Sequence, residues 1–132
     1  MINSKIIRLA SNTKFAGLKN IFTHKSSVKN SLCGDFIKVE IIANKTKIKS
    51  MRYQTESCVI CEASASLLAN KIKNFNLKDL KDNYKLFNKR GEIGFSSKFK
   101  IFNQLLTGKN KSRINCVILP VEALFKALKI SK

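Results

Sequence analysis

Two segments of alternating polarity, separated by a short polar turn, constrain the fold of this chain more than any other feature. In residues 36–43 and again in residues 48–55, apolar side chains alternate with polar ones, as in strands with one buried face. The polar residues 43–47 between them have the length of a hairpin connection. We therefore predict an antiparallel hairpin, which the segment before Cys33 extends to a sheet of about three strands.

Helical patterns flank the predicted hairpin. Residues 2–11 place Ile2, Ile6 and Leu9 at i, i+4 and i+7, the spacing of an amphipathic helix docked on a core. Further helices are expected to begin at Ser57 or Cys58, to cover residues 79–87, and to cover roughly 114–130 with Pro120 in the first turn. A short amphipathic segment is expected over residues 99–106, and His24 is expected to be a solvated loop residue in a polar connection. The sequence thus predicts an α+β fold with a small antiparallel sheet packed against several helices.

The length and hydropathy of the chain limit its organisation. With 132 residues, 44% of them apolar, we expect a single domain over residues 1–132. No apolar run approaches the roughly 18–20 residues that span a bilayer, so we expect a soluble protein with no membrane partner. The first twenty residues are basic and free of acidic side chains, the profile of an organellar presequence, but the docked-helix pattern favours a bacterial-type cytoplasmic protein over an organellar matrix protein.

The net charge of +18 favours anionic partners in general. The distribution of the basic residues does not indicate a dedicated binding site, because only four of the 26 are arginines and the lysines are scattered over every segment. Neither an Arg-aromatic platform nor a reading helix is recognisable. We therefore expect no specific nucleic-acid partner, and we retain a basic nucleic-acid-binding module with a structural zinc as the alternative function.

The cysteines carry the chemistry that the sequence predicts. In a chain without a secretory signal they are expected to be reduced, which points to metal or thiol chemistry. Cys58 and Cys116 each fall at a predicted helix start, where amide groups and the helix dipole stabilise a thiolate. Cys33 stands before the hairpin and Cys58 after it, so the hairpin can bring both to one end of the sheet.

Three motifs together resemble a known family. They are Cys33-Gly34-Asp35-x-Ile37-x-Val39-Glu40, then Cys58-x-Ile60-x-x-Ala63-Ser64-Ala65-Ser66, then Ser112-Arg113-Ile114-Asn115-Cys116-Val117-x-Leu119-Pro120-x-x-Ala123-Leu124. The combination resembles the U-type iron–sulfur cluster assembly scaffolds, the SufU, IscU and NifU N-terminal family, and is closest to SufU-like bacterial members. Asn115 stands where IscU-like members carry His, whereas Arg113 matches SufU-like members.

The resemblance implies a SufE/NifU-like fold and a scaffold function rather than an enzyme, with at most a sulfurtransferase-type acceptor role. It implies that Cys33, Asp35, Cys58 and Cys116 gather at one exposed end to hold zinc, a transient iron–sulfur cluster, or both. It implies a cysteine desulfurase and recipient apo iron–sulfur proteins as partners. Cys116 is the persulfide acceptor candidate, Cys33 is the competing candidate, and Arg113 supports the negative charge.

Cys61 leaves two interpretations open. The Cys58-x-x-Cys61 spacing suits zinc, so a site of four thiolates is one alternative. The favoured alternative is a small buried thiol, which is how a free cysteine usually behaves. A degenerate scaffold relative that binds metal without assembling clusters is a third functional alternative.

Overall fold

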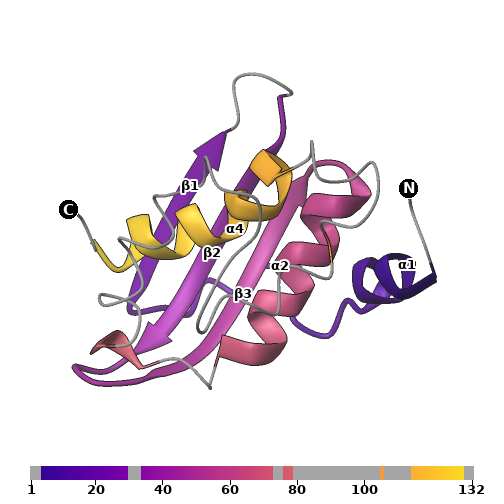
Figure 1. The fold of residues 1–132 in the computed structure, drawn as a ribbon. Coiled ribbons are helices and arrows are strands. Elements are labelled where there is room, and N and C mark those ends of the chain that lie inside the picture. The colour runs from indigo at the N-terminus through magenta and orange to yellow at the C-terminus, as the bar shows by residue number, and fades with distance from the viewer. Residues whose placement is uncertain (1–3, 30–33, 73–75, 79–104, 106–113, 130–132) are drawn as a thin grey trace.

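The structure is a computed structural model that describes residues 4–29, 34–72, 76–78, 105 and 114–129. Its elements are α1 (Ser4–Ser11), β1 (His24–Lys29), β2 (Phe36–Ala43), β3 (Ile48–Glu56), α2 (Val59–Lys71) and α4 (Ile114–Ala127). The three strands form one antiparallel sheet and the helices gather on one side of it, so the predicted α+β fold is confirmed (Figure 1). The helix predicted over residues 79–87 and most of the amphipathic segment predicted over residues 99–106 lie outside the described residues, although Leu105 is fully buried.

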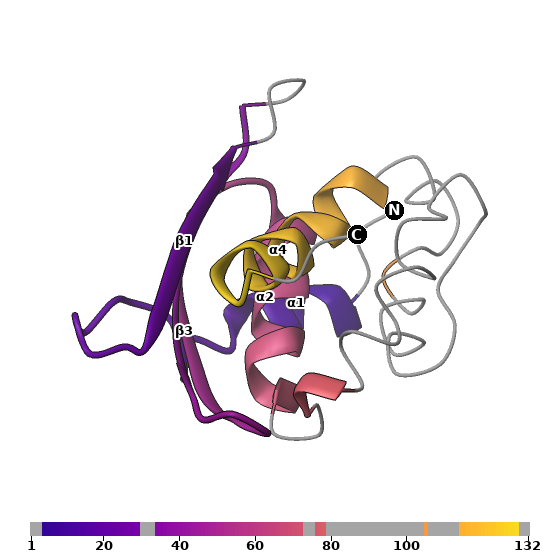
Figure 2. The same cartoon turned by 90° about the vertical axis from the view of Figure 1, so that its left-hand side faces the viewer.

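The sheet has the order β1-β2-β3, and its register divides the side chains cleanly between two faces. Val39 pairs with Ser26 and Tyr53 on the face that α2 and α4 cover (Figure 2). The next residue, Glu40, pairs with Lys25 and Arg52 and points to the opposite, outer face. The hairpin prediction is confirmed, with β2 at its expected bounds, and β1 is the expected third strand.

The core lies between the inner face of the sheet and the helices. Its sheet side includes Ile37, Val39, Ile41, Met51 and Tyr53, all buried. Each large aliphatic side chain removed from water in this way stabilises the fold by roughly 1.5–3 kcal/mol. Helix α1 packs against α2 and buries Ile6 completely, so the docked helix predicted for this segment is confirmed. Within the described residues, no helix is long and apolar enough to cross a membrane.

Helix α2 is buried nearly all round, which explains its small side chains. It touches α1, α4 and β3, and the run from Ala63 to Ser66 lets those neighbours approach closely. The two buried serines keep their hydroxyls bonded: Ser64 Oγ donates to the Val117 carbonyl of α4 at 2.5 Å, and Ser66 Oγ donates to the Asn12 carbonyl at 3.2 Å. The helix therefore packs between α1 and α4 and contacts both of them.

Helix α4 corrects one expectation. Pro120 was expected in the first turn, but the helix begins at Ile114 and therefore contains Pro120 in its interior. Proline has no amide hydrogen, so the helical bond from residue 120 to the carbonyl of Cys116 cannot form. Cys116 itself lies in the first turn, as its predicted position at a helix start requires.

Residues 15–23 form a strap that crosses the outer face from β3 to β1. Gly17 N donates to the Tyr53 carbonyl at 2.7 Å, and Tyr53 N donates to the Phe15 carbonyl at 3.3 Å. At the other end, Thr23 N donates to the Ile41 carbonyl at 2.8 Å. Immediately after the strap, His24 begins β1 and is half-buried, with Nδ1 2.8 Å from Thr23 Oγ1, so its assignment to a solvated loop is wrong.

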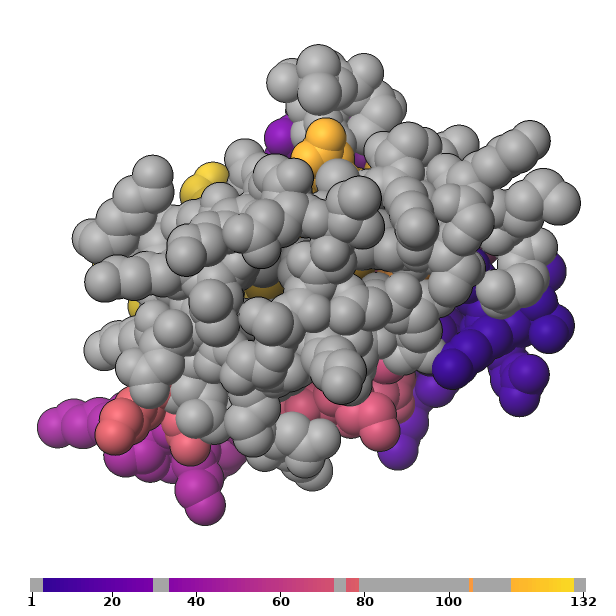
Figure 3. Space-filling view, in the orientation of Figure 1, coloured from indigo at the N-terminus to yellow at the C-terminus, as the bar shows by residue number. Residues whose placement is uncertain are grey.

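The turn between β2 and β3 has its own local support. Asn44 Oδ1 accepts hydrogen bonds from Thr46 N at 2.9 Å and Lys47 N at 2.8 Å, as Asn side chains often do in turns. Residues 76–78 lie against this turn (Figure 3). Leu77 N donates to the Thr46 carbonyl at 3.0 Å. These contacts anchor the end of the hairpin that lies farthest from the predicted cysteine site.

Candidate metal centre

Three ligand side chains from separate parts of the chain meet at one end of the sheet. Asp35 directly precedes β2, Cys58 follows β3 as the N-cap of α2, and Cys116 lies in the first turn of α4. The antiparallel pairing of Phe36 with Glu56 places the start of β2 beside the end of β3. The carboxylate oxygen and the two sulfur atoms lie within 4.8 Å of one another. The fold thus joins residues that sequence spacing alone leaves far apart.

Backbone geometry on either side of β2 and β3 positions these ligands. Gly34 has a φ of +73°, which an L side chain rarely adopts, whereas a Cβ at this position would meet nothing within 4 Å. The glycine of the Cys-Gly-Asp motif is therefore required for its conformation rather than for space. Cys58 is extended (φ −72°, ψ 166°), and its side chain makes no capping hydrogen bond, so the thiol is not engaged by its own helix.

Two hydroxyls hold the junction between β3 and α2, and our sequence analysis did not identify them. Thr55 Oγ1 donates to the Phe36 carbonyl at 2.7 Å and lies 2.7 Å from Ser57 Oγ. The bond to Phe36 ties the end of β3 to the residue after Asp35. The Thr-x-Ser spacing between the strand and the helix is the signal that could have indicated this role, since such hydroxyls often bond nearby backbone groups.

The electrostatics of the three-residue group favour a bound cation. Burial raises the pKa of the Cys116 thiol, and the hydrogen bond and charge of Cys58 and the charge of Asp35 raise it further. Cys116 Sγ accordingly lies 3.5 Å from Asp35 Oδ2 as a hydrogen-bond donor. A metal ion would supply the positive charge that the group lacks and would take the place of the thiol proton.

The donor set also fits a soft or borderline metal. Thiolate sulfur suits zinc and iron–sulfur units, and a carboxylate oxygen is an accepted zinc ligand. Asp35 and Cys116 are buried and Cys58 is half-buried, so the group is sheltered but reachable. Cys33 and Arg113, the other two residues that the sequence assigns to this site, lie outside the described residues.

Cys61 occupies a different environment. Its side chain is fully buried in the core, and it is not part of the group formed by Asp35, Cys58 and Cys116. Burial raises the pKa of Cys61 from 9.0 to about 12, although hydrogen bonds with Ser57 and Thr55 act in the opposite direction. A thiol with such a pKa keeps its proton at neutral pH and behaves as a small apolar side chain.

Sequence comparison matches nearly the whole chain to a protein family and to a known protein. Residues 1–130 match the NifU-like N terminal domain family. The chain is 30% identical to the iron-sulfur cluster assembly scaffold protein IscU of Thermotoga maritima, over 98% of this chain and 93% of that protein.

Solved structures share the fold. The NifU-like N-terminal protein of Brucella abortus superposes with a TM-score of 0.78 at 16% identity, covering 96% of this chain and 91% of that one. A candidate iron-sulfur cluster assembly scaffold protein for the SUF system of Fervidobacterium islandicum gives a TM-score of 0.78 at 22% identity, covering 96% of each chain. From its sequence match over nearly its whole length, this chain belongs to the NifU-like N-terminal domain family of iron–sulfur cluster assembly scaffolds.

Proposed function

We propose that this chain holds zinc or a nascent iron–sulfur cluster through Cys33, Asp35, Cys58 and Cys116, and passes the cluster to apoproteins. The observation that carries the proposal is the meeting of Asp35, Cys58 and Cys116 within 4.8 Å at one end of the sheet. Cys33 stands two residues before Asp35 in the sequence and is the proposed fourth ligand. The family matches favour this function over the nucleic-acid-binding alternative.

Asp35 gives the proposed site its capacity to release cargo. A carboxylate oxygen is a harder ligand than thiolate sulfur and binds iron or zinc less firmly than a fourth thiolate would. Because Asp35 accepts a hydrogen bond from the Cys116 thiol, the two side chains can share a proton whenever the cargo is absent. The site is therefore suited to holding a cluster for a limited time rather than to storing it.

We also propose that the site receives sulfur from a cysteine desulfurase, with Cys116 as the acceptor and Cys33 as the competing candidate. The acceptor thiolate would attack the outer sulfur of the desulfurase persulfide, so that a new S–S bond forms and the desulfurase cysteine leaves as a thiolate. Cys116 must first lose the proton that burial favours, which metal binding promotes. Arg113 is the proposed support for the negative charge.

The metal site is tested by substituting Asp35. In Asp35→Ala, we expect zinc affinity to fall at least about tenfold, because metal-site residues outside the first shell already contribute that much. Zinc competition with a chromophoric chelator measures the affinity, and metal and sulfide analysis of protein purified without air identifies the native cargo. Glu56→Ala is the matched control, since Glu56 is an exposed carboxylate at the end of β3 that lies outside the ligand group.

Unchanged zinc affinity in Asp35→Ala would remove this residue from the set of ligands. The sulfur-acceptor role is tested on the same preparations by incubation with a cysteine desulfurase and cysteine, followed by mass spectrometry of the intact chain and its peptides. We expect the mass of one sulfur atom on Cys116 or Cys33. Absence of added sulfur on Cys33, Cys58 and Cys116 would refute the acceptor role and leave the metal site standing.

A further inference from the structure

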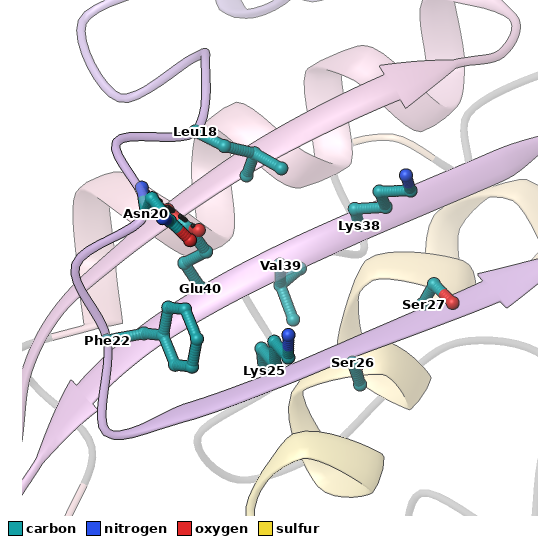
Figure 4. Close-up of a pocket in the computed structure, with 9 residues that line it drawn as sticks. All are labelled: Leu18, Asn20, Phe22, Lys25, Ser26, Ser27, Lys38, Val39 and Glu40. Carbon is teal, nitrogen blue, oxygen red and sulfur yellow. Dashed lines mark hydrogen bonds between the residues drawn. The ribbon is translucent and has the colours of Figure 1, made fainter.

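The outer face of the sheet contains a pocket that the metal centre does not use. It has a volume of about 390 Å³ and lies between the strap and strands β1 and β2 (Figure 4). Its lining includes Leu18, Phe22, Lys25, Ser27, Lys38 and Glu40. None of its lining residues belongs to the group of Asp35, Cys58 and Cys116. An occupant of this pocket would therefore leave those ligands free to hold cargo.

The strap that walls the pocket is held in place by two charged side chains of the sheet. Glu40, which is 6% exposed, accepts hydrogen bonds from Lys19 N at 2.9 Å and Asn20 N at 3.0 Å. Arg52, its cross-strand neighbour, donates to the carbonyls of Gly17 and Ala16, both at 2.8 Å. The wall is thus formed before any ligand arrives, which lowers the entropic cost of binding.

The charges that remain for a ligand are positive. The Glu40 carboxylate accepts hydrogen bonds from the strap amides and faces Arg52, so its negative charge is largely compensated within the protein. Lys25 and Lys38 project from the same face of adjacent strands, and Lys38 has the neutral Ser27 and Gln54 as its cross-strand neighbours. Each ammonium also lies near an aromatic ring, 5.0 Å from the Phe22 centroid for Lys25 and 5.6 Å from the Phe36 centroid for Lys38. The pocket presents two cations beside apolar surface.

Apolar side chains extend beyond the pocket along the strap. Leu18 is 36% exposed and lines the pocket, while Ile21 is 65% exposed and adjoins Phe22 in the sequence. A small anion held by the two lysines would leave Ile21 in water. A protein segment is long enough to cover both the cations and this apolar margin, and the net charge of +18 attracts acidic segments over longer distances.

We propose that this pocket docks an acidic segment of a partner protein, with a carboxylate between Lys25 and Lys38 and an adjacent apolar side chain against Leu18 and Phe22. The partner can bind while the metal centre is loaded, because the two sites share no residue. The inference depends on the sheet and strap alone, so it stands or falls separately from the proposed cluster chemistry.

The test uses the full chain, saturated with zinc, and a capped synthetic tetrapeptide of alternating leucine and aspartate as the probe. We expect peptide-induced changes in amide NMR shifts to centre on Phe22, Lys25 and Lys38. The double variant Lys25→Glu with Lys38→Glu should weaken peptide binding at least about tenfold, because it reverses both charges of the pocket. Ile21→Ser should weaken it as well, with a smaller effect and no change in charge.

The matched control is Lys45→Glu with Lys49→Glu, which makes the same change of net charge at exposed positions near the β2–β3 turn. An equal loss in this control would show that the peptide binds by overall charge, which would overturn the proposal. Equal affinity for a probe with asparagine in place of aspartate would also overturn the proposal. Amide shifts of equal size at the pocket with inorganic phosphate would overturn it too, because they would indicate a site for small anions. Amide spectra of each variant verify that the sheet is intact.

Discussion

The buried thiol of Cys61 ties the stability of the fold to pH in a way that can be measured. Burial is the main cause that raises the pKa of Cys61 from 9.0 to about 12 in the folded protein. In the unfolded chain the thiol ionises near its ordinary pKa of 9.0, so above that pH the unfolded state binds fewer protons than the folded state. The stabilisation is therefore complete below pH 9.0 and is lost as the pH rises towards about 12.

The magnitude follows from the separation of the two pKa values. At about pH 10, one unit above the unfolded pKa, the folded protein loses about 1.4 kcal/mol of unfolding free energy through this group. Cys61→Ala removes the group entirely. We expect the difference in unfolding free energy between the native chain and Cys61→Ala to shrink by about 1.4 kcal/mol between about pH 7.5 and about pH 10.

Urea unfolding of both proteins, with reductant and chelator present, measures this difference. Lysine deprotonation affects both proteins alike and cancels. Leu68→Ala is the control, because Leu68 is equally buried but does not titrate, so its difference from the native chain should not depend on pH. A Cys61→Ala difference that stays constant with pH would refute a buried neutral thiol. A constant difference would require the same thiol pKa in the folded and unfolded states, whereas a thiolate in the folded protein, as in the site of four thiolates, would make the difference grow as the pH rises from about 7.5 to about 9.

Two further substitutions test the packing and the strap. Leu68→Ala at neutral pH should lower the free energy of unfolding by about 2–5 kcal/mol, because truncating a fully buried leucine leaves a cavity. Ile7→Ala, at a position on α1 that is 51% exposed, should lower it much less. Similar losses in the two variants, measured by urea unfolding, would contradict the assigned packing of α2. Arg52→Met should remove two hydrogen bonds to the strap and cost about 1–3 kcal/mol. Hydrogen exchange should then accelerate at the strap amides while β2 stays protected, and unchanged exchange throughout the strap would show that Arg52 does not anchor it.

The sheet was largely predictable from the sequence because its alternation has a physical cause. One face of each strand must enter the core, so Ile37, Val39 and Ile41 recur every second residue and fix both the strand and its register. β1 carries a weaker pattern, since Ser26 stands among the inward positions and Val28 is its one aliphatic residue. The inward Ser26 is accommodated by a hydrogen bond to the Ala123 carbonyl at 2.7 Å, which requires knowledge of where α4 lies.

The sequence predicted which residues belong to the candidate site but not how they are arranged in space. The motifs indicated which side chains belong together, but spacing could not show that Asp35, Cys58 and Cys116 lie within 4.8 Å, because three elements must assemble to bring them there. The hydrogen bond from Cys116 to Asp35 is equally a product of tertiary structure. Pro120 was misplaced for a related reason: its sequence preference for a first turn was overridden by the packing of α4 on the sheet and α2.

The bonds between the strap and Tyr53 have a consequence for the behaviour of the protein at high concentration. β3 is an outer strand of the sheet, and its exposed amides and carbonyls would otherwise offer a template on which a second copy could add a strand. In the middle of that strand, the Tyr53 amide donates to the Phe15 carbonyl and the Tyr53 carbonyl accepts from Gly17 N. The strap thereby obstructs intermolecular β-pairing at the middle of the β3 edge, and the positive charge of the chain further discourages the approach of another copy.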